Sequence, residues 1–173
     1  MTTVAEFSTI EVLPNGRRVE IRALRPTDRE DMLAAVGRTS TQSIYRRFFN
    51  VRRRFSEAET AFFLNPDFVR HVALVAVAEE GGTPVIAGGG RYVVINPGQA
   101  EVAFAVIDQF QGQGIGTALL RHLSSITRKA GLQELVAEVL PENAAMLKVF
   151  EKSELKVTTR RESQTIHVVL RLW

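Results

Sequence analysis

The sequence of 173 residues contains no cysteine. This excludes disulfide bonds, thiolate metal ligands and a covalent thioester on a cysteine. The histidines are also few, and His71, His122 and His167 lack the spacing of a metal site, so no bound metal is expected. The chain has no apolar run of roughly 18 residues and no basic-then-apolar signal pattern at its N-terminus. We therefore expect no membrane association and a cytoplasmic location.

Length and composition are those of an ordinary globular domain, so we expect residues 1–173 to form a single domain. Residues 1–16 are interpreted as a loose arm or an edge strand. The net charge of +3 is modest, but arginines crowd one stretch, at Arg46, Arg47, Arg52, Arg53 and Arg54. Such a cluster could bind nucleic acid, an acidic protein surface or cofactor phosphates, or be a solvated helix end. Since no recognition motif accompanies it, nucleic acid is the weakest of these interpretations.

The first half of the chain alternates between helix and strand signals. Val19, Ile21 and Ala23 alternate with polar residues, as in a half-buried strand. Thr27 and Glu30 form a capping-box pattern that predicts a helix to about Val36. Two further helices are predicted at about 40–49 and 56–64.

From residue 69 onward, the pattern predicts a sheet with helices on its faces. Strands at about 69–78, 85–95 and 100–107 are joined by short loops, which favours an antiparallel meander, with Gly88-Gly89-Gly90 as a bend or bulge. A helix at 114–130 and a strand at 135–140 follow, and this order makes the strands before and after the helix parallel. A helix at 143–152 and a hairpin of 155–160 with 165–172 end the chain. The predicted fold class is α/β with a mixed sheet and no doubly wound order.

The strongest functional signal lies where an apolar strand meets an amphipathic helix. Phe104-Ala105-Val106 lead into a segment with three alternate glycines, Gln111-Gly112-Gln113-Gly114-Ile115-Gly116-Thr117. Glycine lets backbone amides approach a ligand, and unpaired amides at a helix N-terminus suit a pyrophosphate. The alternative is a turn that only packs the helix on the strand. A P-loop is disfavoured because no lysine follows Gly116, and a Rossmann fingerprint because the glycine spacing differs.

This segment resembles the pyrophosphate loop of the GNAT superfamily of N-acetyltransferases, Gln/Arg-x-x-Gly-x-Gly/Ala. Gln111, Gly114 and Gly116 fill those places. The resemblance implies the GNAT fold and acetyl-CoA as co-substrate. The cofactor-binding residues that it implies are Phe104, Ala105, Val106, Gln111, Gly112, Gln113, Gly114, Ile115, Gly116, Thr117, Asn143 and Phe150. Phe150 stands where the family often has a tyrosine acid, and Glu154-Leu155 stand where Gly-Phe is usual.

Residues 40–49 in the N-terminal half resemble the Pat-type bacterial protein lysine acetyltransferases, and Glu101-Val102-Ala103-Phe104-Ala105-Val106 fit the same group. That resemblance implies a protein lysine as the favoured acceptor and Glu101 as the base that takes its proton. Tyr45 is expected to line the acceptor pocket. Asp108 and His71 are weaker candidates for the base, and His122 is expected to face solvent.

Without a cysteine, direct attack in a ternary complex is the expected route. A small amine acceptor, a non-catalytic acetyl-CoA-sensing module and a homodimer all remain open.

Overall fold

The computed structural model describes residues 3–37 and 57–173. Within these, the strands are β1 (Ser8–Val12), β2 (Arg18–Ala23), β3 (His71–Glu80), β4 (Thr83–Asn96), β5 (Gln99–Val106), β6 (Glu134–Val139), β7 (Lys156–Arg161) and β8 (Ile166–Arg171). The helices are α1 (Arg29–Gly37), α3 (Glu57–Leu64), α4 (Ile115–Lys129) and α5 (Ala144–Glu151), with 3₁₀ turns η1 (Val4–Glu6), η2 (Pro26–Asp28) and η3 (Asp108–Phe110). The predicted helix at 40–49, Tyr45 and the arginine cluster lie outside the described residues.

The described strands form one mixed sheet in the order β1-β2-β3-β4-β5-β6-β8-β7. Every neighbouring pair is antiparallel except β5 and β6, which are parallel because α4 connects them. The predicted α/β class with a mixed sheet is confirmed. The arm at the N-terminus contributes the edge strand β1.

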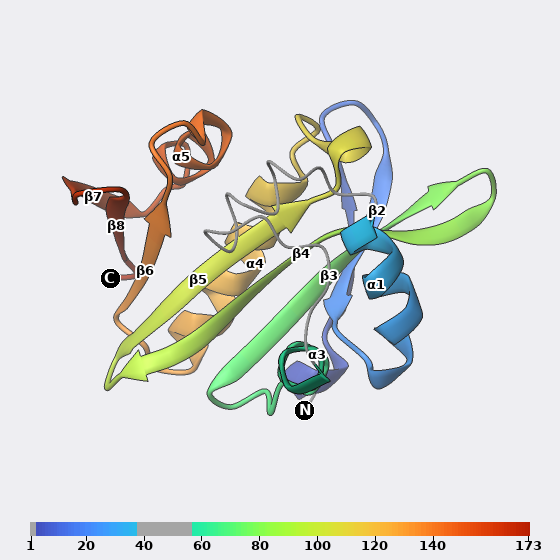
Figure 1. Cartoon of the computed structure of the whole chain (residues 1–173), viewed down its shortest axis with the longest axis horizontal. Helices are drawn as coiled ribbons and strands as arrows, with labels where there is room; N and C mark the ends of the chain where they lie inside the picture. The colour runs from blue at the N-terminus through green and yellow to red at the C-terminus, as the bar shows by residue number, and fades with distance from the viewer. Residues whose placement is uncertain (1–2, 38–56) are drawn as a thin grey trace.

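Helices cover both faces of the sheet: α4 lies behind it in Figure 1, and α1 and α3 lie in front. The helix α4 is amphipathic, as predicted, and packs its apolar face on the sheet, where Leu119 and Leu123 are both 0% exposed. On the other face, Met32 of α1 packs against a smaller cluster that includes Ala73 and Val75 of β3. Because β3 is buried on both faces, its sequence is an almost continuous apolar run.

The glycines of β4 allow close packing as well as a bulge. The β3–β4 register shifts at Ala76/Val77, so Ala87 is the extra residue on β4, directly before Gly88. A Cβ on Gly90 would lie 2.6 Å from the Phe104 ring, and one on Gly88 would lie 2.9 Å from the Ala105 carbonyl oxygen. These glycines therefore let β5 and its side chains approach β4.

The capping box predicted from Thr27 and Glu30 is wrong. The helix α1 begins at Arg29 directly after η2, and the capping box lies two residues earlier than predicted: Arg25 is the N-cap of η2, and the carboxylate of Asp28 accepts its backbone N–H at 2.7 Å. The same carboxylate accepts two hydrogen bonds of 2.8 Å from the Arg22 guanidinium. Pro26 explains the shift, because a proline fits the first turn of a helix.

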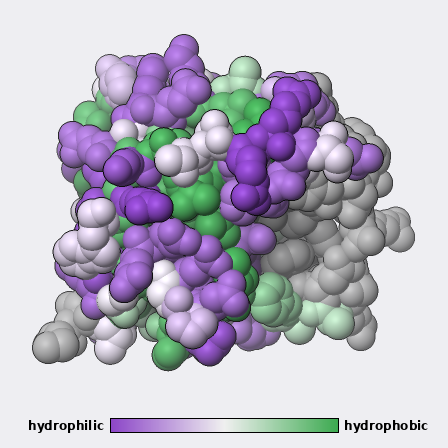
Figure 2. Space-filling model, turned by 90° about the vertical axis from the view of Figure 1, so that its left-hand side faces the viewer, coloured by the Kyte–Doolittle hydropathy of each residue, from purple (hydrophilic) through white to green (hydrophobic). Residues whose placement is uncertain are grey.

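The C-terminal edge of the sheet is polar. The edge strand β7 is largely exposed and carries Lys156, Arg160 and Arg161, charges that discourage pairing with another chain. Figure 2, which views the molecule from this side, shows a mainly hydrophilic surface with a hydrophobic strip through its centre. In the described part of the chain, no helix has the length and apolar character needed to cross a membrane.

Candidate active site

The site begins where the parallel strands β5 and β6 separate. They are paired at Gln99, Ala100 and Glu101, and Glu101 lies opposite Val136. Beyond this pair both strands continue without pairing, and Figure 1 shows them diverging like the arms of a V. The opening forms part of a cleft of about 850 Å³, whose walls include Val102 to Val106 and Ala137 to Val139. A cleft of this size accommodates a cofactor-sized ligand.

The backbone of β5 leaves polar groups directed into this opening. The N–H of Ile107 donates to the Ala87 carbonyl on β4 at 2.9 Å. Because backbone groups alternate along a strand, the N–H and C=O of Val106 point away from β4. The Val106 carbonyl accepts a 2.9 Å hydrogen bond from the side chain of Gln111. The Val106 N–H is therefore directed toward the opening between the strands.

The glycine-rich segment forms the end of the cleft nearest α4. Gly112 and Gly114 have positive φ values of 77° and 100°, so both need glycine. Gly114 is the N-cap of α4 and supplies no side-chain cap, and the first helical hydrogen bond runs from the Ala118 N–H to its carbonyl. The amides of the first turn, residues 115–117, consequently lack partners within the helix. Together with the helix dipole, they form a site that favours an anion.

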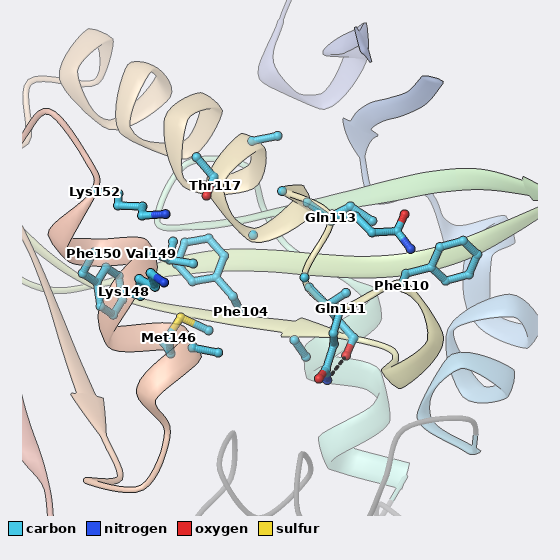
Figure 3. A pocket seen from close by; sticks show the side chains of 18 of the residues that line it. Phe104, Phe110, Gln111, Gln113, Thr117, Met146, Lys148, Val149, Phe150 and Lys152 are labelled. Carbon is cyan, nitrogen blue, oxygen red and sulfur yellow. Dashed lines mark hydrogen bonds between the residues drawn. The ribbon is translucent and has the colours of Figure 1, made fainter. Parts of the chain in front are cut away.

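The side chains of α5 form the wall opposite α4. Figure 3 shows Lys148 and Lys152 at the rim, with Lys152 facing Thr117. Asn143 caps α5, since its side-chain oxygen accepts the Met146 N–H at 3.2 Å. Phe150 is 2% exposed, and its ring centroid lies 6.2 Å from that of Phe104.

The turn between β1 and β2 closes the third side of the cleft. Asn15 donates to the Gln113 side chain at 3.3 Å. Glu11 of β1 bonds to Arg121 and to His122 of α4, each at 2.5 Å. Burial favours the neutral form of Glu11, but these bonds outweigh it and lower its pKa. The expectation that His122 faces solvent is wrong, because β1 covers it.

Glu101, the predicted base, lies outside the wall of the cleft, which begins at Val102. Its register partner on β4 is Val93, and both side chains point to the face opposite α4, because buried Ala100 and Val102 face α4. Glu101 is exposed and stands at the point where β5 and β6 begin to diverge. It could therefore reach the opening from the face that α4 does not cover.

His71 lies in the same row across the sheet, with Val93 between it and Glu101. It is 6% exposed, stacks on the Phe62 ring at 4.5 Å between centroids, and accepts a 2.8 Å hydrogen bond from Arg91. Burial, and secondly the Arg91 charge, lower the pKa of His71 to about 4. The imidazole is thus neutral at neutral pH, and its Nε2 is occupied by Arg91.

Asp108 is exposed at the start of η3, and its carboxylate lies 3.5 Å from the Gln111 side-chain nitrogen. This matches a role in shaping the turn.

All of the predicted cofactor-binding residues line one cleft, although they come from β5, α4, α5 and the segment between β5 and α4. Sequence reasoning missed Lys148 and Lys152, whose i, i+4 spacing on α5 was a usable signal, and Glu138 of β6. It also missed the wall built by residues 11–15, because nothing local links that turn to α4. Within the described ranges, no group of three or more His, Asp or Glu side chains could hold a metal ion.

An open groove between two parallel strands, ending at a glycine-rich helix N-terminus, defines a site for an extended ligand that carries phosphate. The chain belongs to the acetyltransferase (GNAT) family, whose model matches residues 39–154.

Two curated relatives are similar over most of this chain. Acetyltransferase PA5475 of Pseudomonas aeruginosa is 32% identical over 138 residues, 79% of this chain and 74% of the relative. Acetyltransferase Pat of Mycolicibacterium smegmatis is 34% identical over 139 residues, 79% of this chain but 41% of Pat. This chain therefore matches less than half the length of Pat.

Solved structures share the fold. The GNAT domain of S. lividans PAT is 32% identical, with a TM-score of 0.86 and coverage of 95% of this chain and 96% of that one. The yncA protein of Salmonella typhimurium, solved with its cofactor acetyl-CoA, is 20% identical with a TM-score of 0.64, covering 88% of this chain and 92% of that one. The GNAT fold is confirmed, and this chain is an acetyltransferase of that family.

Proposed function

We propose that this protein transfers the acetyl group of acetyl-CoA to a primary amine, with a protein lysine as the favoured acceptor. The observation that carries the proposal is the divergence of β5 and β6 beside the uncapped N-terminus of α4, in one cleft. The similarity to Pat and to the GNAT domain of PAT supports a lysine acceptor, as does the sequence resemblance of residues 40–49 and 101–106.

The residues of the cleft fit coenzyme A from end to end. The pantetheine is extended and hydrogen-bonds like a strand, and the backbone groups of β5 that point away from β4 are not paired with β6 at Phe104 and Val106. Coenzyme A carries roughly four negative charges on its phosphates at neutral pH. The amides at 115–117 favour the diphosphate, and Lys148 and Lys152 add positive charge at the rim.

The reaction needs a neutral amine, because an alkylammonium ion has a pKa of about 10.4 and no free electron pair. In our proposal, Glu101 takes the proton, directly or through one water. The nitrogen lone pair then attacks the thioester carbonyl carbon and the N–C bond forms. The C–S bond breaks, coenzyme A leaves with the electron pair as the thiolate, and the second proton of the nitrogen passes to solvent or to that thiolate, which leaves the neutral amide. The Val106 N–H, directed into the opening, would stabilise the oxyanion that develops.

Phe150 leaves the departing sulfur without a proton donor at that position. A thiolate has a pKa of about 8.5, so it can leave as the anion, but more slowly than with an acid beside it. Phe150 is also the observation that favours a second candidate, an acetyl-CoA-sensing module without turnover. Its ring, buried against Phe104, would pack beside the cofactor and donate nothing.

One experiment separates these candidates. Acetyl-CoA binding is measured by calorimetry, and thiol release is followed with lysine peptides, polyamines and other small amines. Turnover on a peptide supports the proposal, turnover on small amines alone moves the acceptor to that class, and binding without turnover supports the sensor. If acetyl-CoA does not bind, both functions are refuted.

The role of Glu101 has its own test. Glu101→Gln keeps the shape of the side chain but cannot take a proton, so it should bind acetyl-CoA normally and lose about 10²–10⁴-fold in kcat. Glu134→Gln, on the neighbouring strand, is the matched control and should keep its rate. Unchanged turnover of Glu101→Gln at neutral pH would exclude Glu101 as the base.

A further inference from the structure

A second carboxylate lies at the same opening as Glu101. Val136 is the register partner of Glu101, and Glu138 follows it by two residues on β6. Residues two apart on a strand share a face, so Glu138 points to the same side of the sheet as Val136 and Glu101. Glu138 lines the cleft on the β6 side, past the point where β6 leaves β5.

Glu138 is held in place by two donors from one side. The imidazole Nδ1 of His167, its register partner on β8, donates to one carboxylate oxygen, and the Thr165 hydroxyl donates to the other at 2.7 Å. Burial favours the neutral form of Glu138, but these two bonds and the charge of Arg160 outweigh it and lower its pKa. Glu138 is therefore ionised at neutral pH and fixed at the edge of the cleft.

The charges on the two sides of β5 differ in sign. On the β4 side, Arg91 pairs in register with Ala103 and lies on the same face as Glu101. Arg91 is cationic and bonded to His71, so it repels an ammonium ion. On the β6 side, the charge that lies at the opening is the carboxylate of Glu138. Arg160, beside His167 on β7, lies farther from the opening and is paired with Glu162 at 2.8 Å. An amine that arrives protonated is therefore drawn to the β6 side of Glu101.

Since the amine acceptor reaches the protein as an ammonium ion, it must be bound in that form before Glu101 removes its proton. We propose that Glu138 binds the ammonium group of the acceptor at the mouth of the opening and passes it toward Glu101. His167 is a positioning residue that acts through Glu138. This inference rests on the proposed function and adds to it the means by which a charged amine is selected.

The test separates binding of the ammonium from chemistry. Glu138→Gln keeps the hydrogen bond to Thr165 or His167 but loses the charge, so the KM for a lysine peptide should rise about tenfold while the Kd of acetyl-CoA stays unchanged. Hydroxylamine, which is largely uncharged at neutral pH, is the control acceptor, and its KM should change less than twofold. The matched control variant is Glu134→Gln, on the same face of β6 at its paired end, where Gln99 donates to Glu134.

The positioning role of His167 is tested by two replacements. His167→Gln retains a donor for Glu138 and should keep the KM for the peptide within about threefold, whereas His167→Leu should raise it nearly as far as Glu138→Gln. Thermal unfolding of each variant checks that the sheet is intact. An equal rise in KM for hydroxylamine, or no rise for the peptide, would overturn the inference and leave the acetyltransferase activity standing. If the wild-type protein does not bind acetyl-CoA, the proposed function itself is refuted.

Discussion

The glycine-rich segment allows stability and ligand binding to be tested apart. Gly112 and Gly114 have left-handed φ values of 77° and 100°, whereas Gly116 lies in the first turn of α4 with an ordinary helical φ. Alanine at each position adds the same methyl group. The three variants therefore differ in backbone strain and in what the methyl group meets.

The expected changes in stability have opposite signs. Alanine at a left-handed position costs about 1–2 kcal/mol, so Gly112→Ala and Gly114→Ala should lower Tm by roughly 2–8 °C. Gly114→Ala should be the worse of the two, since its Cβ would lie 3.2 Å from Pro14 Cδ, while that of Gly112 meets nothing within 4 Å. Gly116→Ala should stabilise the protein by up to about 1 kcal/mol, because alanine is the better helix former. Its Cβ makes only an ordinary 3.6 Å contact with Val149.

The expected change in binding is largest at Gly114. This residue is the N-cap of α4, and strain there should displace the amides of residues 115–117 that we assign to the diphosphate, so Gly114→Ala should weaken acetyl-CoA binding at least tenfold, or about 1.4 kcal/mol. The GNAT pattern has glycine or alanine at the place of Gly116, so Gly116→Ala should keep the Kd within about twofold. Calorimetry gives the Kd, and thermal unfolding without ligand gives Tm. A Gly114→Ala variant that binds acetyl-CoA like the wild type would refute the role of this turn in phosphate binding, and an unchanged Tm for Gly114→Ala would refute the strain.

Two predictions concern buried charge away from the cleft. Asp28→Asn should lower the free energy of unfolding in urea at neutral pH by about 3 kcal/mol, because buried Arg22 then keeps only the weaker ion pair with Glu20 at 3.8 Å. Replacing both Asp28 and Arg22 by apolar residues should cost less. Burial opposes ionisation of Asp28, but the bonds from Arg22 and Arg25 lower its pKa, so its contribution should be lost only as the pH falls below about 4. The pKa of His71 is lowered to about 4 by burial and Arg91, so the unfolded chain binds a proton that the folded one does not as the pH falls from about 6.5. The free energy of unfolding should then drop by roughly 3 kcal/mol by about pH 4. In His71→Leu this dependence of stability on pH should disappear. If the variant loses stability between these pH values as the wild type does, His71 is not the group responsible.

Local signals in the sequence predicted the elements that surround the cleft. The strand at 100–107 and the helix at 114–130 are long and strongly periodic, and the glycines between them need conformations that few other residues adopt. The structure places them as β5, α4 and the segment between. His122 was assigned wrongly because helical periodicity shows which face of α4 is polar but not that β1 lies over part of that face. Thr27 and Glu30 matched a cap pattern, but the buried Arg22 determines that Asp28 is the residue used.

Local sequence signals do not predict the opening between β5 and β6. Whether β5 and β6 stay paired or separate after Glu101 depends on contacts between strands, and no residue pattern within either strand encodes it. Glu138 was missed for the same reason: it resembles any exposed strand residue until the register places it beside the cleft with His167 behind it.

The alternation of β5 explains how one strand could serve two ligands. Its large apolar side chains, Val102 and Phe104, face α4 and are buried there. The other face carries Ala103 and Ala105, which pair in register with Arg91 and Gly89 of β4, and the Arg91 side chain bonds to His71 of β3. The small side chains of β5 leave space above the strand between Glu101 and the end of β5, so an amine from that side could reach a thioester held in the opening. A larger residue should close this path: Ala103→Leu should raise the KM for the acceptor and lower kcat without changing the Kd of acetyl-CoA. Equal loss of cofactor binding would mean that both ligands approach from the α4 side, and the division of the two faces would be wrong.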